Sequence, residues 1–157
     1  LRDLGAPLSP FNAFQIIQGL ETVALRMKQH CVNAEKVVAF LETQKKVTNV
    51  IYPTNHQGEI KERAKRYMQG GYGSLVGMDV GTREAGSKFI DNLKMLYHVA
   101  NIGDARSLAI HPATTTHSQL NDEELLAAGV TPGYVRLSIG IEHPDDIISD
   151  IKQALAA

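Results

Sequence analysis

Apolar residues recur at helical intervals near the start of the chain. Ser9 followed by Pro10 is typical of a helix start, because the serine hydroxyl can cap free main-chain N–H groups and proline lacks a donor that would go unused. The following turns are apolar around most of the helix, which is wider than one packing partner requires: Phe11, Ala13, Phe14, Ile16, Ile17 and Leu20. We therefore predict a helix from about Pro10 that contacts two separate bodies.

A second helix is predicted from about Thr22 to Gln44. Its apolar positions alternate steps of three and four residues, which forms one narrow seam: Ala24, Met27, Cys31, Ala34, Val38 and Leu41. The repeat is too short to predict a coiled-coil oligomer, so packing on a local sheet is the expected use. Because Cys31 lies in the seam, we expect a small buried hydrophobic residue and not a nucleophile.

The rest of the chain alternates short β-prone runs with short helices. We predict strands at 47–51, 74–80, 96–100 and 134–139, and helices at 59–68, 83–93, 121–128 and from Pro144 onward. The segment 111–117 is predicted to be a loop, since it has turn formers and little periodicity. This order predicts an α+β fold of two layers, with a small mixed, largely antiparallel sheet and helices mainly on one face.

Length and composition exclude several classes of protein. A chain of 157 residues is long enough for one domain with an ordinary core. The net charge of −1 argues against nucleic acid as a partner, and no apolar run is long enough to cross a membrane. One cysteine cannot form an internal disulfide, so we expect a cytoplasmic protein. Because the first methionine is Met27, we expect a piece of a longer polypeptide.

Two motifs that could carry chemistry have simpler explanations. The glycines of Gly71-Tyr-Gly73-Ser-Leu-Val-Gly77 have the wrong spacing for a dinucleotide loop, and we expect a turn into a strand that needs close backbone approach. Histidines His98, His111 and His117, even with Asp104, lack the further ligands that zinc requires. We therefore predict no metal site, with the loop histidines hydrogen-bonded to the backbone. No Gly-x-Ser-x-Gly motif supports a hydrolase.

Arg136 is the residue that we single out. Alternation along 134–139 places Val135, Leu137 and Ile139 on one face and Arg136 with Ser138 on the other. If the first face belongs to the core, the second faces solvent or a cavity. On composition alone, an ordinary surface arginine is the better interpretation.

Two segments in the second half of the chain suggest a more specific role for Arg136. Segment 101–117, from Asn101-Ile-Gly-Asp104 to Thr114-Thr-Thr116-His117, and segment 133–142 around Arg136 closely resemble the C-terminal domain of Cys/Met-metabolism enzymes that depend on pyridoxal phosphate. The resemblance spans essentially all of the chain. Within the family these motifs are most similar to O-acetylhomoserine sulfhydrylases, which join sulfide or a thiol to the substrate with loss of acetate, whereas lyases and cystathionine synthases usually have serine at position 101.

The resemblance implies that the cofactor machinery lies elsewhere. It implies the C-terminal domain of a fold-type I transferase, with residues 1–157 forming a substrate-carboxylate-binding domain and 1–21 a connecting helix toward a missing N-terminal domain. That domain would hold the pyridoxal phosphate and its lysine, in a homotetramer. None of the lysines in this chain lies in the family's Schiff-base motif, so we expect no bound cofactor, no catalytic residue and no activity from this piece alone.

The family roles of three residues transfer to this sequence. Arg136 would hold the α-carboxylate of the amino-acid substrate, since a planar guanidinium donates two parallel charged hydrogen bonds. Asn101 would add an amide near the same carboxylate. Thr116 would support Arg136 from the neighbouring loop.

Two alternatives remain open from the sequence. One is another transsulfuration enzyme of the same family, of the cystathionine γ-synthase or methionine γ-lyase type. The other is a non-catalytic interaction module that kept the fold. The wide apolar face of the first helix argues against a free module, which should have covered that face or replaced it with charge.

Overall fold

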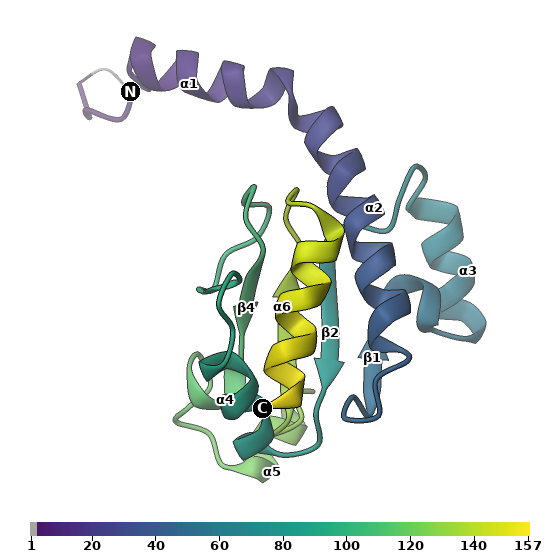
Figure 1. Cartoon of the computed structure of the whole chain (residues 1–157). Helices are drawn as coiled ribbons and strands as arrows, with labels where there is room; N and C mark the ends of the chain where they lie inside the picture. Colours follow the sequence, from purple (N-terminus) through teal and green to yellow (C-terminus); the bar gives the residue numbers. More distant parts are fainter. Residues whose placement is uncertain (1–2) are drawn as a thin grey trace.

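The computed structural model describes residues 3–157, and the two residues at the start of the expected 1–21 connecting segment lie outside this range. Helices and strands follow one another as α1 (Pro10–Glu21), α2 (Val23–Leu41), β1 (Asn49–Ile51), η1 (Pro53–Asn55), α3 (Gly58–Tyr67), β2 (Leu75–Asp79), α4 (Arg83–Asp91), β3 (Tyr97–His98), β4 (Leu108–Ile110), η2 (Pro112–Thr114), α5 (Asp122–Ala127), β5 (Tyr134–Ser138) and α6 (Pro144–Ala156) (Figure 1). Within 3–157, no helix is both long and apolar enough to cross a membrane.

The strands form one sheet in the order β1-β2-β5-β4-β3. Every neighbouring pair is antiparallel except β3 and β4, which run parallel. The predicted small, mixed, largely antiparallel sheet is therefore confirmed. β5 lies at its centre, bonded to β2 on one side and β4 on the other.

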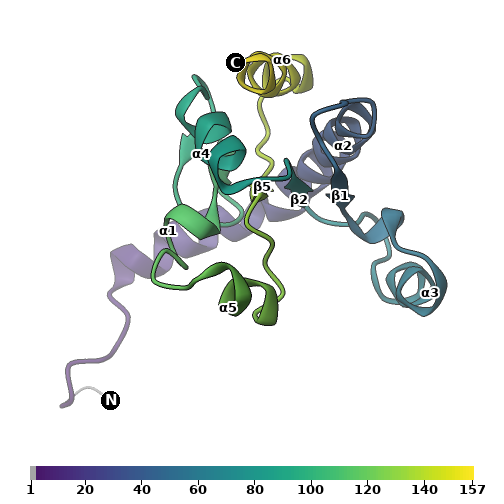
Figure 2. The same ribbon diagram turned by 90° about the horizontal axis from the view of Figure 1, so that it is seen from below.

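Three helices cover one face of the sheet. Figure 2 shows α2, α4 and α6 on one side of the strands and α5 on the other. The core between helices and sheet is mostly aliphatic, and its fully buried side chains include Val76, Leu137, Ile147 and Ile151. The expected alternation in β5 holds for Val135 and Leu137, which are buried in this core, and for the half-buried Arg136 between them. Ser138, predicted to share the face of Arg136, is also buried.

The first helix stands away from this core. The hydroxyl of Ser9 accepts a hydrogen bond from the N–H of Asn12, and Pro10 occupies the first turn, which confirms the predicted start. None of the residues of α1 is buried, and the helix projects beyond the sheet (Figure 1). Its apolar side chains are more than half exposed: Phe11, Phe14, Ile16, Ile17 and Leu20.

The second helix is shorter than predicted, and a different set of its residues is buried. It ends at Leu41 instead of Gln44, and its first apolar positions, Ala24 and Met27, remain exposed. Its buried stripe instead includes the polar residues His30 and Asn33. Both bind the chain after β5, because the Nδ1–H of His30 donates to the carbonyl of Ile139 at 2.6 Å and Asn33 Nδ2 donates to the carbonyl of Gly140 at 3.0 Å. These two polar residues are buried because they form hydrogen bonds, which a pattern of hydrophobic residues cannot predict.

Cys31 is buried, as predicted, and it explains one of the glycines. A Cβ atom on Gly71 would lie 2.6 Å from the Sγ atom of Cys31. Gly71 also has a φ of +143°, which side-chain-bearing residues rarely adopt. The expectation of a turn with close backbone approach before β2 is confirmed.

Strand β4 is absent from the sequence-based prediction. Its three residues Leu108–Ile110 are all buried, and β4 lies between β5 and β3 in the sheet. A strand so short and so uniformly apolar has no alternation to detect. The predicted strand at 96–100 reduces to Tyr97–His98, and the predicted loop at 111–117 contains the short helix η2.

Candidate functional site

Arg136 occupies the middle of the central strand and faces away from the helix layer. Its neighbours Val135 and Leu137 point into the core, so the two-residue period of a strand turns Arg136 toward the opposite face. The side chain is half-buried there. Arg136 therefore extends from a strand at the centre of the sheet, which fixes the position of its main chain.

The guanidinium has unused hydrogen-bonding capacity. Its Nη2 donates to the main-chain oxygen of Asn101 at a long 3.4 Å, and its Nε is buried with no partner. Among the ion pairs of residues 3–157, none involves Arg136. A buried donor without a partner costs free energy, so an anion that accepted its hydrogen bond would be bound favourably.

Arg136 opens into a cavity of about 270 Å³. The walls come from β1, η1, β2 and β5 and are mostly apolar, and Ile51, His56, Leu75 and Tyr134 are among the residues that line the cavity with Arg136. Burial raises the pKa of Tyr134, and the positive charge of Arg136 partly offsets this effect. An anion in this cavity would find one fixed cation in an apolar setting, where charge attraction is stronger than in water.

Asn101 lies beside Arg136, but it contacts the guanidinium through its main chain and not through its side-chain amide. Its carbonyl accepts the hydrogen bond from Arg136, while its side-chain Oδ1 accepts one from the N–H of Ile102 at 2.8 Å. Within the described part of the chain, no hydrogen bond engages the Nδ2 of Asn101. The amide nitrogen is thus free to donate on the same side of the sheet.

Thr116 lies on the exposed turn after η2. Its hydroxyl is hydrogen-bonded to the Nδ1 of His117 at 2.9 Å, and no hydrogen bond among residues 3–157 joins it to Arg136. The short helix η2 nevertheless contacts β5, the strand that carries Arg136. The structure thus brings Arg136 and Asn101 into contact, and the roles of Arg136, Asn101 and Thr116 in binding a carboxylate stay predictions.

His111 has a structural explanation. It is fully buried, with Nε2 2.8 Å from the carbonyl of Pro132 and Nδ1 2.9 Å from the hydroxyl of Thr114. The predicted hydrogen bonding of a loop histidine to the backbone is confirmed at this position. Burial lowers the pKa of His111, with the Pro132 hydrogen bond as an opposing influence. Throughout residues 3–157, no group of three or more His, Cys, Asp or Glu residues could hold a metal ion.

A polar network at the end of β5 was not predicted from the sequence. Glu142 accepts hydrogen bonds from the N–H of Ser107 at 2.6 Å and from its hydroxyl at 2.9 Å, and the Ser107 hydroxyl accepts one from the N–H of Gly140 at 2.8 Å. Asn33 of α2 donates to the carbonyls of Gly140 and Glu142. The network joins the loop after Asn101 to the end of β5. The sequence signal for this network is that Ser107 and Glu142 lie in the two segments, 101–117 and 133–142, that resemble the family.

Known proteins that are similar to this chain point to one family. The family model of the Cys/Met metabolism PLP-dependent enzymes matches residues 1–156. The O-acetyl-L-homoserine sulfhydrylase of Leptospira meyeri is 52% identical over 157 residues, and the homocysteine synthase of Schizosaccharomyces pombe is 44% identical over 156 residues. The L-methionine gamma-lyase of Fusobacterium nucleatum is 43% identical over 159 residues. Each comparison covers 99% of this chain.

The fold is shared with a solved structure. A crystal structure from Campylobacter jejuni, assigned as an O-acetylhomoserine (thiol)-lyase and containing a pyridoxyl-lysine phosphate, has a TM-score of 0.88 and 43% sequence identity. It is matched over 99% of this chain but only 37% of its own length, and the chain spans 36% of the Leptospira meyeri relative. The chain spans about one third of the length of these relatives, and it belongs to the pyridoxal-phosphate-dependent enzymes of Cys/Met metabolism.

Proposed function

We propose that this chain is the C-terminal part of an O-acetyl-L-homoserine sulfhydrylase and that Arg136 binds the α-carboxylate of the amino-acid substrate. The observation that carries the proposal is the guanidinium itself, which has a buried Nε without a partner and faces a mostly apolar cavity. A carboxylate would accept two of its donors and become oriented by them. Orientation of the substrate against the reactive group is a large part of catalysis in such enzymes.

Asn101 and Thr116 complete the proposed carboxylate site. The Nδ2 of Asn101 would donate to the carboxylate next to the Arg136 hydrogen bonds, while its carbonyl holds Nη2 in place. Thr116 would support the guanidinium from the turn after η2, a helix that already contacts β5. These three residues bind and orient the substrate, and we propose no catalytic residue within this chain.

The residues that line the cavity do not fit the cofactor by themselves. None of the lining residues is a lysine that could hold pyridoxal phosphate, and none is an acidic residue that could pair with its pyridine nitrogen. When bound, the cofactor supplies the electron sink for replacing acetate by sulfide or a thiol. We propose that the remainder of the full-length enzyme holds it, so that the 157-residue chain is inactive alone.

The proposal also assigns a partner to the exposed helix α1. Its five large apolar side chains would pack against the N-terminal cofactor domain and neighbouring subunits of a homotetramer. A free interaction module would not retain such a surface without a partner. We propose a cytoplasmic location, where a free, buried cysteine such as Cys31 stays reduced.

A second candidate function comes from the lyases of the same family. The L-methionine gamma-lyase relative is nearly as similar as the homocysteine synthase, so lyase activity is the second candidate. The asparagine at position 101 favours the sulfhydrylase, because the lyases usually have serine there. Turnover of O-acetylhomoserine with sulfide, measured against release of methanethiol from methionine, separates the two.

The carboxylate role is tested by Arg136→Lys in the full-length enzyme. A lost charged hydrogen bond costs roughly 1.5 to 3 kcal/mol, which is a rise in KM of about tenfold to more than a hundredfold. Arg63→Lys is the matched control, because Arg63 is an exposed arginine on α3 that pairs only with Glu59 among the described residues. An unchanged KM in the Arg136 variant, with a normal melting temperature, would refute the role.

A further inference from the structure

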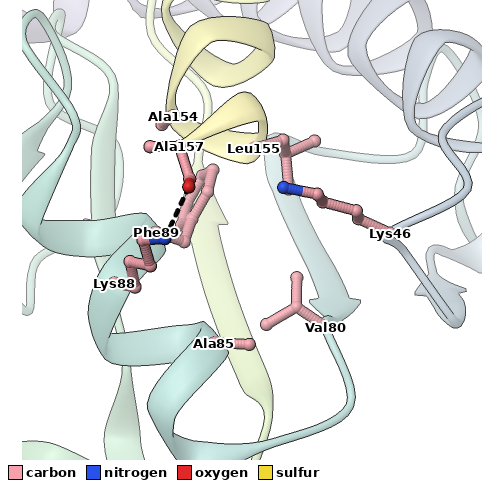
Figure 3. A pocket seen from close by; sticks show the side chains of 8 residues that line it. All are labelled: Lys46, Val80, Ala85, Lys88, Phe89, Ala154, Leu155 and Ala157. Atoms are coloured by element: carbon pink, nitrogen blue, oxygen red, sulfur yellow. Dashed lines mark hydrogen bonds between the residues drawn. The ribbon is translucent and has the colours of Figure 1, made fainter.

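Sulfur atoms are concentrated at one cavity of the molecule. The chain contains one cysteine and four methionines, and three of these five residues, Met27, Cys31 and Met68, line a single cavity of about 510 Å³. This cavity lies between the first half of α2 and the segment that leads from the end of α3 to β2. Among the described residues, no sulfur lines the Arg136 cavity or the cavity between α4 and the end of α6, whose side chains Figure 3 shows.

The thiol of Cys31 is buried and has no hydrogen-bonding partner. The residue is 9% exposed, it is not in a disulfide, and no hydrogen bond engages its Sγ within residues 3–157. Because Gly71 has no side chain, the main chain after Met68 passes directly against this thiol, and a Cβ atom on Gly71 would lie 2.6 Å from Sγ. A sulfur without a partner is thus held at the wall of the cavity.

Two thioethers reach the same cavity from two different elements. Met27 precedes Cys31 by one helical turn, a separation that places their Cβ atoms about 5 to 6 Å apart on one face of α2. Met68 follows α3 and lines the same cavity. Both methionines are partly exposed, and their three rotatable side-chain bonds let each Sδ approach the Cys31 Sγ without movement of the main chain.

We infer that this cavity binds one soft monovalent metal ion of the copper(I) class, ligated by the Cys31 thiolate and the thioethers of Met27 and Met68. Thiolate and thioether sulfur are the ligands that select copper(I), whereas magnesium and calcium take oxygen ligands and zinc takes thiolate, imidazole and carboxylate. No carboxylate or imidazole is among the described residues that line the cavity. The inference departs from the sequence prediction of no metal site, which was drawn from ligands for zinc.

The charges at the cavity favour a monovalent ion. Binding replaces the S–H bond of Cys31 by a bond from Sγ to the metal and releases one proton to solvent, with no change in oxidation state. A thiolate and a monovalent ion form a neutral pair. A divalent ion would leave a positive charge near Lys28, which is the one charged side chain among the described residues that line the cavity. Lys28 is itself exposed, so its ammonium group remains in water.

The inference is tested by titrating the full-length protein with copper(I), supplied as its bicinchoninate complex under reducing, oxygen-free conditions. Loss of the absorbance of that complex reports the copper that the protein takes up. We expect the wild type to bind one more copper(I) ion per chain than Cys31→Ser. Arg136→Lys should take up as much copper as the wild type, because this site does not depend on the proposed carboxylate site. Equal uptake by the wild type and Cys31→Ser, with a normal melting temperature, would overturn the inference.

Methionine variants separate a site of three sulfurs from capture of copper by a single thiol. Met27→Leu and Met68→Leu keep the size of the side chain and remove the thioether. Each should weaken binding about tenfold or more, since even residues behind the ligands of a metal site contribute that much to affinity. Met95→Leu is the matched control, because Met95 lies outside the cavity, and affinity should stay within about twofold. Unchanged affinity in both the Met27 and the Met68 variant would overturn the inference.

X-ray absorption at the copper edge identifies the ligands without any substitution. The wild-type full-length protein, loaded with one copper(I) ion per chain, should show three sulfur neighbours around the metal. Nitrogen or oxygen neighbours, or a single sulfur, would contradict the proposed ligand set.

Discussion

The ring of Tyr134 occupies the space that a side chain on Gly77 would fill. A Cβ atom on Gly77 would lie 2.7 Å from Cε2 of Tyr134 and 3.0 Å from its hydroxyl oxygen. Gly77 is also the residue directly opposite Arg136 in the ladder between β2 and β5. The missing side chain at this position therefore lets an aromatic ring lie across the strand beside the guanidinium.

Gly77→Ala should displace Tyr134 toward the Arg136 cavity. Overpacking of this kind costs about 1 to 3 kcal/mol of stability, and we expect KM for the amino-acid substrate of the full-length enzyme to rise several-fold. Steady-state kinetics and thermal unfolding measure the two effects. Adding Tyr134→Ala to Gly77→Ala removes the clashing ring and should recover part of the stability. If the double variant is no more stable than the sum of the single effects predicts, the steric relationship is wrong.

Asp150 should make the fold sensitive to acid. Burial alone would raise the pKa of this carboxyl group, but hydrogen bonds from the N–H groups of Leu96, Met95 and Lys94, and from Gln153, lower the pKa overall. A carboxylate with a lowered folded pKa contributes stability that is fully present above its unfolded value of about 3.9 and is lost as the pH falls through the folded pKa. Unfolding free energy measured by urea titration should therefore decline below about pH 4.

Asp150→Asn should cost roughly 2 to 4 kcal/mol at pH 7, because the amide places an N–H group against main-chain donors. The loss should shrink as the pH falls, since the wild-type carboxylate is then protonated as well. Asp91→Asn, an exposed aspartate at the end of α4, should change stability by less than about 0.5 kcal/mol. Equal destabilisation by the two substitutions at every pH would contradict this account.

The 157-residue chain expressed alone should self-associate through α1. The exposed side chains of Phe11, Phe14 and Ile17 have no partner within the described residues and form a large apolar surface. Analytical ultracentrifugation should detect oligomers that disappear when these three residues are replaced by serine. Triple replacement of Glu59, Glu62 and Arg63 by serine on the charged helix α3 is the control. A monomer for the unmodified chain at micromolar concentration would argue against a severed interface.

Ser107→Ala should loosen the loop that carries Asn101. The substitution removes one donor to Glu142 and the acceptor of the Gly140 N–H, so we expect a loss of about 2 kcal/mol. In the full-length enzyme it should also raise KM for the substrate, because Asn101 holds the guanidinium of Arg136. Ser118→Ala, at an exposed position, should leave both quantities unchanged. A normal KM in a destabilised Ser107 variant would separate the network from substrate binding.

Local patterns were sufficient for most of the elements and for the face of the sheet on which Arg136 lies. Helix starts at Ser9 and Asn121 depend on caps within four residues, and the two faces of β5 follow from the alternation of residues 134–137. The placement of Arg136 opposite the core is thus encoded by its immediate neighbours. Family resemblance then supplied the identity of the anion that such an arginine would bind.

Tertiary structure decided the features that depend on distant partners. β4 is a strand because β3 and β5 lie on its two sides, and His30 and Asn33 are buried because they bind main-chain carbonyls more than a hundred residues away. The contact of Arg136 with Asn101 spans 35 residues and runs through a main-chain oxygen, which no side-chain pattern encodes. Periodicity reports which face of an element is apolar, whereas hydrogen bonds and cavities arise only when separate elements are brought together.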